Sequence, residues 1–224
     1  YKRQAMKKIK NPLIRRIPKE LIGDWKKYLV VFLFLVLTIG FVSGMYVANE
    51  SMITSANEGV TKYKQEDGHF ELKKQADATL LSAIETGEKA DFKATKTTLY
   101  ENFFRNEEED YNNDGKKDGT IRVFAKTKDI NLACMLQGSF PQKADEIAID
   151  RMHADNVGIK VGDTVTVSGE TYKVVGLLAY VNYSTLHEKT TDLMFDALKF
   201  DVAMVTQDGF DRLHKSIHYT YAVS

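Results

Sequence analysis

The chain has 224 residues, in which 31 Lys and Arg are balanced by 31 Asp and Glu, and it contains a single cysteine, so an internal disulfide framework is excluded. The charge is divided unevenly: residues 1–27 carry ten basic and two acidic residues, a charge of +8, and residues 28–224 carry −8. Because nucleic-acid binding requires a basic face, the acidic remainder argues against a nucleic-acid partner.

Residues 13–28 predict a basic amphipathic helix that lies in the membrane interface, within a cytoplasmic segment of residues 1–27. Apolar side chains recur there every three or four residues, while Lys and Arg occupy mostly other positions around the helix. A charged flank that only stops membrane transfer is the alternative. The recurring apolar residues are Ile14, Ile17, Leu21, Trp25 and Tyr28.

The stretch from residue 28 to residue 49 contains no charged residue and is apolar on every helical face. About 20 such residues span the ~30 Å hydrocarbon core of a bilayer, so residues 28–48 predict a transmembrane helix. A cleaved signal peptide is the competing interpretation, with residues 42–44 as a weak cleavage site. Basic residues beside a first span stay in the cytoplasm, which places the amino terminus inside and the residues after about 50 outside.

Residues 49–66 predict a polar stalk that continues the span, and residues 67–224 predict one extracytoplasmic domain. We expect strands at 69–72, 97–104, 119–126, 146–150, 164–167, 172–178 and 200–206, with the acidic segment between 104 and 119 as a turn. Helices are expected at 75–85, 151–156 and 209–216, and a final strand near residue 219. Because helices and strands alternate irregularly, the predicted class is α+β.

The acidic turn contains a pattern that resembles a metal-binding loop. Asp110, Asn112, Asp114 and Asp118 match the opening of a calcium loop, which places oxygen ligands at alternate positions before a glycine. The twelfth position, where a bidentate acid belongs, holds Ile121. We therefore predict a solvated turn and no metal site, with calcium binding as the alternative.

Other chemical motifs are weaker still. His214 and His218 have the spacing of a metal pair on a helix but lack the Glu of the H-E-x-x-H motif. Cys134 has no catalytic signature and is expected to be a small buried hydrophobe. The sequence contains neither the phosphate-binding G-x-x-x-x-G-K-[ST] loop nor a G-x-S-x-G nucleophile turn. We predict no enzymatic activity and no cofactor.

The segment from residue 138 to residue 176 resembles the periplasmic core domain of MacB-like, FtsX-like ABC transporter permeases. The segment from residue 13 to residue 52 resembles the interfacial helix and first span of the large permeases of Gram-positive bacteria. The core-domain motifs are a strand with an acid at each end, a G-I-x-x-G-D turn and a Y-x-V-V-G strand, formed here by Glu146, Asp150, Gly158, Ile159, Gly162, Asp163, Tyr172, Val174, Val175 and Gly176.

The resemblance implies a permease subunit in the plasma membrane, with a cytoplasmic ATPase as a separate chain and a second permease copy or homologue as further partner. It implies that ATP hydrolysis moves the spans and the outer domain, for export or mechanotransmission. Such permeases have four or more spans, so we expect this chain to be an amino-terminal fragment. A complete single-pass protein that displays a binding or signalling domain is the alternative. The sequence does not identify the transported substrate.

Overall fold

The structure is a computed structural model that describes residues 22–87, 97–189 and 191–224. It divides into two units, Tyr1–Ser55 and Ala56–Ser224. The second begins within the predicted stalk, and we call it the C-terminal unit. The predicted interfacial helix lies outside the described residues as far as residue 21.

Helix α2 (Trp25–Thr61) contains the whole predicted span and continues through most of the predicted stalk. Among the described residues it is the one helix that is long and apolar enough to cross a membrane. Its 37 residues correspond to a length of about 55 Å, well beyond the ~30 Å of a hydrocarbon core. The helix therefore crosses the boundary between the two units without a break.

The C-terminal unit is built on a large sheet that closes on itself. Its strand order is β5-β8-β6-β9-β4-β3-β7, and β7 also pairs with β8, so six strands form a closed barrel to which β5 is added. Two of the pairings are parallel, β4 with β9 and β6 with β8, and the others are antiparallel. The strands are β3 (Phe104–Asp110), β4 (Gly119–Ala125), β5 (Cys134–Gly138), β6 (Glu146–Asp150), β7 (Thr164–Val167), β8 (Glu170–Ala179) and β9 (Phe200–Val205).

The two faces of this sheet carry two separate apolar clusters, as strand alternation requires. The first contains Ile121, Ile147, Val165, Val174 and Ala203 among others, and it draws on five of the six barrel strands. It fills the inside of the barrel. In β7, the two buried valines belong to this cluster, whereas the two threonines, which are less buried, lie on the outer face. The second cluster covers the outer face and includes residues of β3, β4, β6, β8 and β9.

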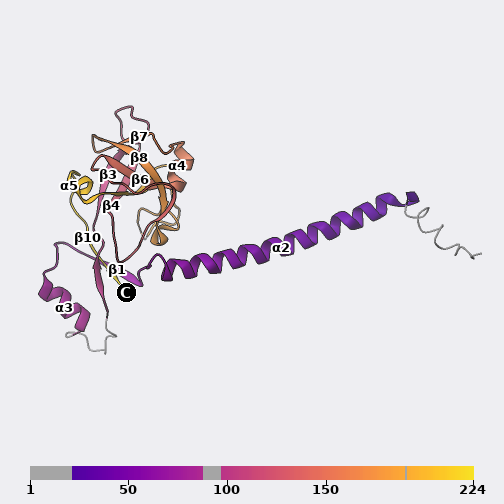
Figure 1. Cartoon of the computed structure of the whole chain (residues 1–224), viewed down its shortest axis with the longest axis horizontal. Helices are drawn as coiled ribbons and strands as arrows, with labels where there is room; N and C mark the ends of the chain where they lie inside the picture. Colours follow the sequence, from indigo (N-terminus) through magenta and orange to yellow (C-terminus); the bar gives the residue numbers. More distant parts are fainter. Residues whose placement is uncertain (1–21, 88–96, 190) are drawn as a thin grey trace, which may run out of the picture. The chain divides into compact units, whose positions relative to one another are not determined.

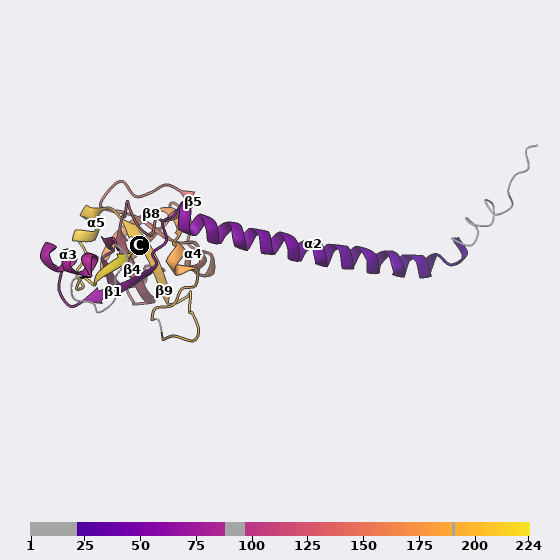
Figure 2. The same ribbon diagram turned by 90° about the horizontal axis from the view of Figure 1, so that it is seen from below.

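A smaller sheet has the order β1-β10-β2 and lies away from β7 with helix α3 beside it (Figure 1). Its strands are β1 (Gly68–Leu72), β2 (Leu99–Glu101) and β10 (Tyr219–Val223). Strand β10 is the centre of the sheet, so the last strand of the chain pairs with the first strand of the domain. Helices α3 and α4 lie on opposite sides of the C-terminal unit in both views (Figures 1 and 2).

The short helices begin and end at capping residues. Asp77 caps α3 (Ala78–Thr86), Asp150 caps α4 (Arg151–Val157) and Thr206 caps α5 (Gln207–Asp211), each accepting a backbone hydrogen bond through its side chain. Glycines with positive φ, Gly87 and Gly158, end the first two. A 3₁₀ turn, η1 (Val181–Tyr183), follows β8.

The predicted α+β class and most predicted elements are confirmed, with four corrections. The acidic segment is not all turn: Phe104–Asp110 forms β3, whose position between β4 and β7 compensates for its low strand propensity. The strand predicted over 97–104 is only β2, because β2 and β3 belong to different sheets. Strand β5 was missed, and α5 ends at Asp211 rather than near residue 216.

Two glycines of the motif in residues 138–176 have distinct structural roles. At Gly176, an added Cβ would lie 2.5 Å from the carbonyl oxygen of Ser139, and β8 shifts register at this point. Gly176 therefore allows a close approach of two backbone segments that a side chain would prevent. Gly162 instead has open space around it, but its φ of +107° is one that L residues rarely adopt.

We expect Gly162→Ala to lower the free energy of unfolding by about 1–3 kcal/mol, because the new Cβ strains the backbone at this φ. The matched control is Gly68→Ala, since Gly68 also has no atom within 4 Å of the added Cβ but has no positive φ. Urea unfolding of the full chain in detergent, followed by near-ultraviolet circular dichroism, measures both. Equal midpoints for the two variants would contradict the role assigned to Gly162.

Candidate functional site

The residues of the predicted calcium-like turn run from the last residue of β3, Asp110, through the connection to β4, and their oxygens accept hydrogen bonds from the turn itself. The two Asp110 carboxylate oxygens accept from the backbone N–H groups of Asp114 (3.1 Å) and Gly115 (2.8 Å). Asp118 accepts from the N–H of Tyr111 and from both the backbone N–H and the side-chain amide of Asn112. This geometry is that of a tight Asx-type turn. Calcium binding there stays an untested alternative.

The structure does not bring the other sequence candidates together. Both His214 and His218 lie beyond the end of α5, so they do not share a helical face. The ring of His218 stacks on Phe104 and its Nδ1 lies 2.8 Å from a Glu71 oxygen. Cys134 is half-buried rather than buried, and it accepts a hydrogen bond from the Tyr63 hydroxyl.

A different group of side chains meets inside the barrel. It consists of Glu109 on β3, His153 on α4 and Asp201 on β9, and we call it the buried cluster. All three residues are fully buried, with 0% of each exposed. Among the described residues, this is the one group of three acidic, histidine or cysteine side chains whose potential ligand atoms converge, all within 4.8 Å of one another.

Strand register explains why the two acids converge. In β3, Glu107 pairs with Ile121 of β4, and Ile121 in turn pairs with Asp201 of β9. These residues share one face, and Glu109, two residues further along β3, lies on the same face opposite Gly119. Position 119 must be glycine here, because an added Cβ would lie 2.7 Å from the carbonyl oxygen of Lys199, directly before β9.

Helix α4 supplies the histidine. Asp150 caps this helix and accepts hydrogen bonds from the backbone N–H groups of Met152 and His153. These bonds fix the position of the His153 backbone, from which the imidazole extends. His153 Nδ1 lies 2.8 Å from the carbonyl oxygen of Ala197, so Nδ1–H is the donor. His153 Nε2 therefore points to the acids and lies 3.3 Å from a Glu109 carboxylate oxygen.

Charges in the buried cluster perturb one another strongly. Burial alone would lower the pKa of His153, but the carboxylates of Asp201 and Glu109 outweigh it and raise that pKa to about 9. Burial raises the pKa of Asp201 well above its usual range, although His153 acts in the opposite direction. The pKa values of His153 and Asp201 are therefore both raised, the first by the neighbouring carboxylates and the second by burial.

The sequence analysis missed all three residues. Glu109 was assigned to the acidic turn, and its neighbour Asp110 was chosen instead, although successive strand residues face opposite sides. An acidic residue near the start of a buried strand, as in the Phe200–Val205 segment FDVAMV, was the available signal for Asp201. No spacing in the sequence relates His153 to the two acids, because the three residues come from separate elements.

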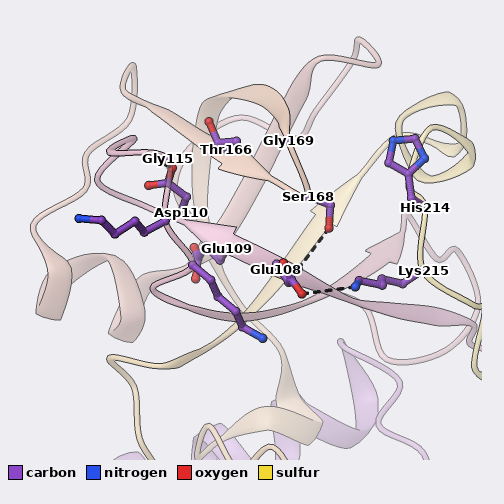
Figure 3. A pocket seen from close by; sticks show the side chains of 11 residues that line it. Glu108, Glu109, Asp110, Gly115, Thr166, Ser168, Gly169, His214 and Lys215 are labelled. Carbon is purple, nitrogen blue, oxygen red and sulfur yellow. Dashed lines mark hydrogen bonds and ion pairs between the residues drawn. The ribbon is translucent and has the colours of Figure 1, made fainter.

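A surface cavity of about 540 Å³ lies on the outer side of β3, beside the β7–β8 turn. Figure 3 shows Glu108 in it, with dashed lines to Ser168 and Lys215; the Glu108 carboxylate lies 3.3 Å from Lys215 Nζ. Its neighbour Glu107 is buried, and it accepts hydrogen bonds from the Lys215 backbone N–H and the Ser168 hydroxyl. The cavity has a mixed charge and indicates no particular ligand.

No family model and no curated protein matches the chain. Among solved structures, the periplasmic region of MacB from Actinobacillus actinomycetemcomitans matches 64% of this chain at 10% identity and a TM-score of 0.37. The extracellular domain of the noncanonic ABC-type transporter YknZ from Gram-positive bacteria matches 70% of this chain and 83% of its own length, at 13% identity and a TM-score of 0.36.

Both matched structures are domains of the kind that the sequence resembles. The match spans 63% of the length of the MacB region, which is less than two thirds.

Two adjacent glutamates on β3, the buried Glu107 and the half-exposed Glu108, test whether the Glu107 hydrogen bonds stabilise the fold. We expect Glu107→Ala to lower the free energy of unfolding by about 1–3 kcal/mol, because it removes the acceptor of two hydrogen bonds. Glu108→Ala should cost about 0–1 kcal/mol, since its ion pair with Lys215 is half exposed on both sides. Thermal and urea unfolding of the full chain in detergent would compare them. Similar costs for both variants would show that the Glu107 hydrogen bonds do not stabilise the fold.

Proposed function

We propose that this chain is the amino-terminal part of an FtsX-like permease subunit of an ABC transporter. Its amino terminus lies in the cytoplasm, α2 crosses the plasma membrane, and the C-terminal unit lies outside. A separate cytoplasmic chain binds and hydrolyses ATP, and a second permease copy or homologue completes the transporter. The resemblance of residues 13–52 and 138–176 to such permeases and the charge of +8 before the span support this proposal.

The observation that carries the proposal is the attachment of α2 to the C-terminal unit. The segment directly after the helix is hydrogen-bonded to the segment before β5: the carbonyl oxygens of Tyr63 and Lys64 accept from the N–H groups of Leu132 (2.8 Å) and Asn131 (3.0 Å). The backbone N–H of Glu66 donates to the Asn131 side chain at 3.1 Å. A membrane-crossing helix fastened in this way transmits displacement, whereas a flexible linker would absorb it.

The position of the last strand, β10, is consistent with this proposal. Strand β10 runs antiparallel to β1, and the N–H of Asp67 donates to the carbonyl oxygen of Val223 at 2.8 Å. Residues that follow Ser224 would therefore start beside the residues that follow α2. We propose that the further spans expected of such a permease leave the domain at this point.

In this proposal, ATP hydrolysis in the cytoplasm moves the spans, and α2 conveys the motion to the outer domain. The domain then handles or extrudes its substrate outside the membrane. A single-pass protein that displays a recognition domain is the competing function, and it requires neither an ATPase nor a rigid connection.

The orientation is testable with single cysteines placed at Lys7 and Lys62 in a Cys134→Ser background. Serine keeps a hydroxyl that accepts from Tyr63. We expect a membrane-impermeant thiol reagent added to intact cells to label position 62 and not position 7, because the basic flank stays in the cytoplasm. Permeabilised cells, in which both positions should react, are the control. Labelling at position 7 alone would show that the chain has the opposite orientation to the one proposed.

Mechanical coupling is testable by inserting a flexible Gly/Ser linker after Ser55 in the complete permease, in its native cell. We expect the ATPase subunit still to co-purify and to hydrolyse ATP, while the variant no longer restores the phenotype of a gene deletion. The linker interrupts α2 and leaves its attachment at residues 63–66 in place.

The matched control is a helix-forming insertion of the same length, which keeps the connection stiff and should be less damaging. Full activity with the flexible linker would rule out transmission through α2. Absence of any co-purifying ATPase from the native membrane would rule out the transporter and favour the single-pass recognition protein.

A further inference from the structure

We propose that the buried cluster of Glu109, His153 and Asp201 is a binding site for one divalent transition-metal ion, with Zn²⁺ as the best-fitting probe. The ion would join β3, α4 and β9 inside the barrel. This site is separate from the proposed transport function and from the calcium-like turn, whose first residue, Asp110, belongs to the opposite face of β3.

The first argument is hydrogen bonding. Four buried side-chain atoms of this cluster have no hydrogen-bond partner: both carboxylate oxygens of Glu109, Nε2 of His153 and Oδ2 of Asp201. Buried polar atoms in native proteins are nearly always paired, and a group of unpaired ones requires an explanation such as a bound ion. A proton on Nε2 would form a hydrogen bond with one Glu109 oxygen, at 3.3 Å, and would leave the other unpaired oxygens without a partner. A metal ion would contact all three side chains.

The second argument is geometry. Ligand atoms about 2.0–2.1 Å from a tetrahedral ion lie about 3.3 Å from one another. The observed separation of Nε2 and the Glu109 oxygen is 3.3 Å, and one ligand atom from each of the three residues lies within 4.8 Å of the other two. One imidazole and two carboxylates form a mixed nitrogen and oxygen set, which suits Zn²⁺ and similar ions better than Ca²⁺. Two carboxylates also neutralise a divalent charge.

The third argument is the support behind the ligands. His153 donates its Nδ1–H to the Ala197 carbonyl, which leaves Nε2 as the coordinating atom, as is usual for metal-binding histidines. The other Asp201 oxygen, Oδ1, accepts from the N–H groups of Asp150 (3.2 Å) and Val202 (2.7 Å), so Oδ2 remains directed for binding. Both ligands are thus held in place by groups that do not take part in coordination.

One residue that contacts the buried cluster also lines a surface cavity. A cavity of about 440 Å³ is lined by Tyr111, Asn112, Gly158 and Asp163 among others. The Tyr111 ring packs edge-on against the His153 ring, with centroids 5.8 Å apart. Tyr111 is only half-buried, so one side chain lies between this cavity and the His153 ring.

The experiment uses the full chain in detergent after treatment with a chelator. On addition of Zn²⁺ and removal of the excess, we expect about one ion per chain by elemental analysis and a higher melting temperature, because an ion that binds only the folded state stabilises it. Glu109→Gln, His153→Gln and Asp201→Asn should each weaken Zn²⁺ binding by more than about 100-fold, the upper end of the loss caused by changing only a supporting residue.

Two matched acid-to-amide controls should bind Zn²⁺ like the unchanged chain. Asp155→Asn alters an exposed acid on α4, where the carboxylate only pairs with Arg151, and Asp118→Asn alters the calcium-like turn. If either control lost binding as completely as the cluster variants, the ion would bind elsewhere and the proposal would fail.

X-ray absorption at the zinc edge of the unchanged chain decides the matter even if the cluster variants do not fold. We expect a first shell of nitrogen and oxygen atoms that includes one imidazole, from His153. Two or more imidazoles would indicate surface histidines and overturn the proposal. Failure to retain zinc would show that the cluster holds protons instead. None of these results affects the orientation or linker experiments.

Discussion

Pairing of β7 with β8 turns an open sheet into a closed barrel, and the organisation of the C-terminal unit depends on that closure. Without it, β7 would be an edge strand joined only to β3, through two residue pairs. The closed sheet has an inside and an outside, and the two apolar clusters fill one side each. The conformation of Gly162 leads the chain into β7, so a single backbone position helps to set up the closure.

Closure also creates the most unusual feature of the interior. A barrel packed with valine, isoleucine and alanine contains three converging ionisable side chains, although burying charge in such surroundings is costly unless it is compensated. Glu107, on the same strand and face as Glu109, accepts a hydrogen bond at each carboxylate oxygen. Neither oxygen of Glu109 accepts a hydrogen bond, although one lies 3.3 Å from His153 Nε2, so two acids two residues apart have different environments in the same barrel.

The connection between the barrel and the long apolar helix has a different physical basis. Helix α2 is longer than the about 20 residues that a membrane span requires, and its last turns belong to the C-terminal unit. There, residues 63–66 are held by backbone hydrogen bonds to residues 131 and 132. The strands β1 and β10 pair in one small sheet, so residues far apart in the chain lie side by side close to the end of α2.

The sequence alone determined the features that depend on neighbouring residues. These are the long apolar helix, helices α3 and α4, and strands β7 and β8, because hydrophobic periodicity and turn residues are local properties. Only the tertiary structure decided that the acidic segment Phe104–Asp110 is a central strand, since its place between β4 and β7 overrides its composition. Only the tertiary structure could bring Glu109, His153 and Asp201 together, because strand register and barrel closure are set by contacts between residues far apart in the chain.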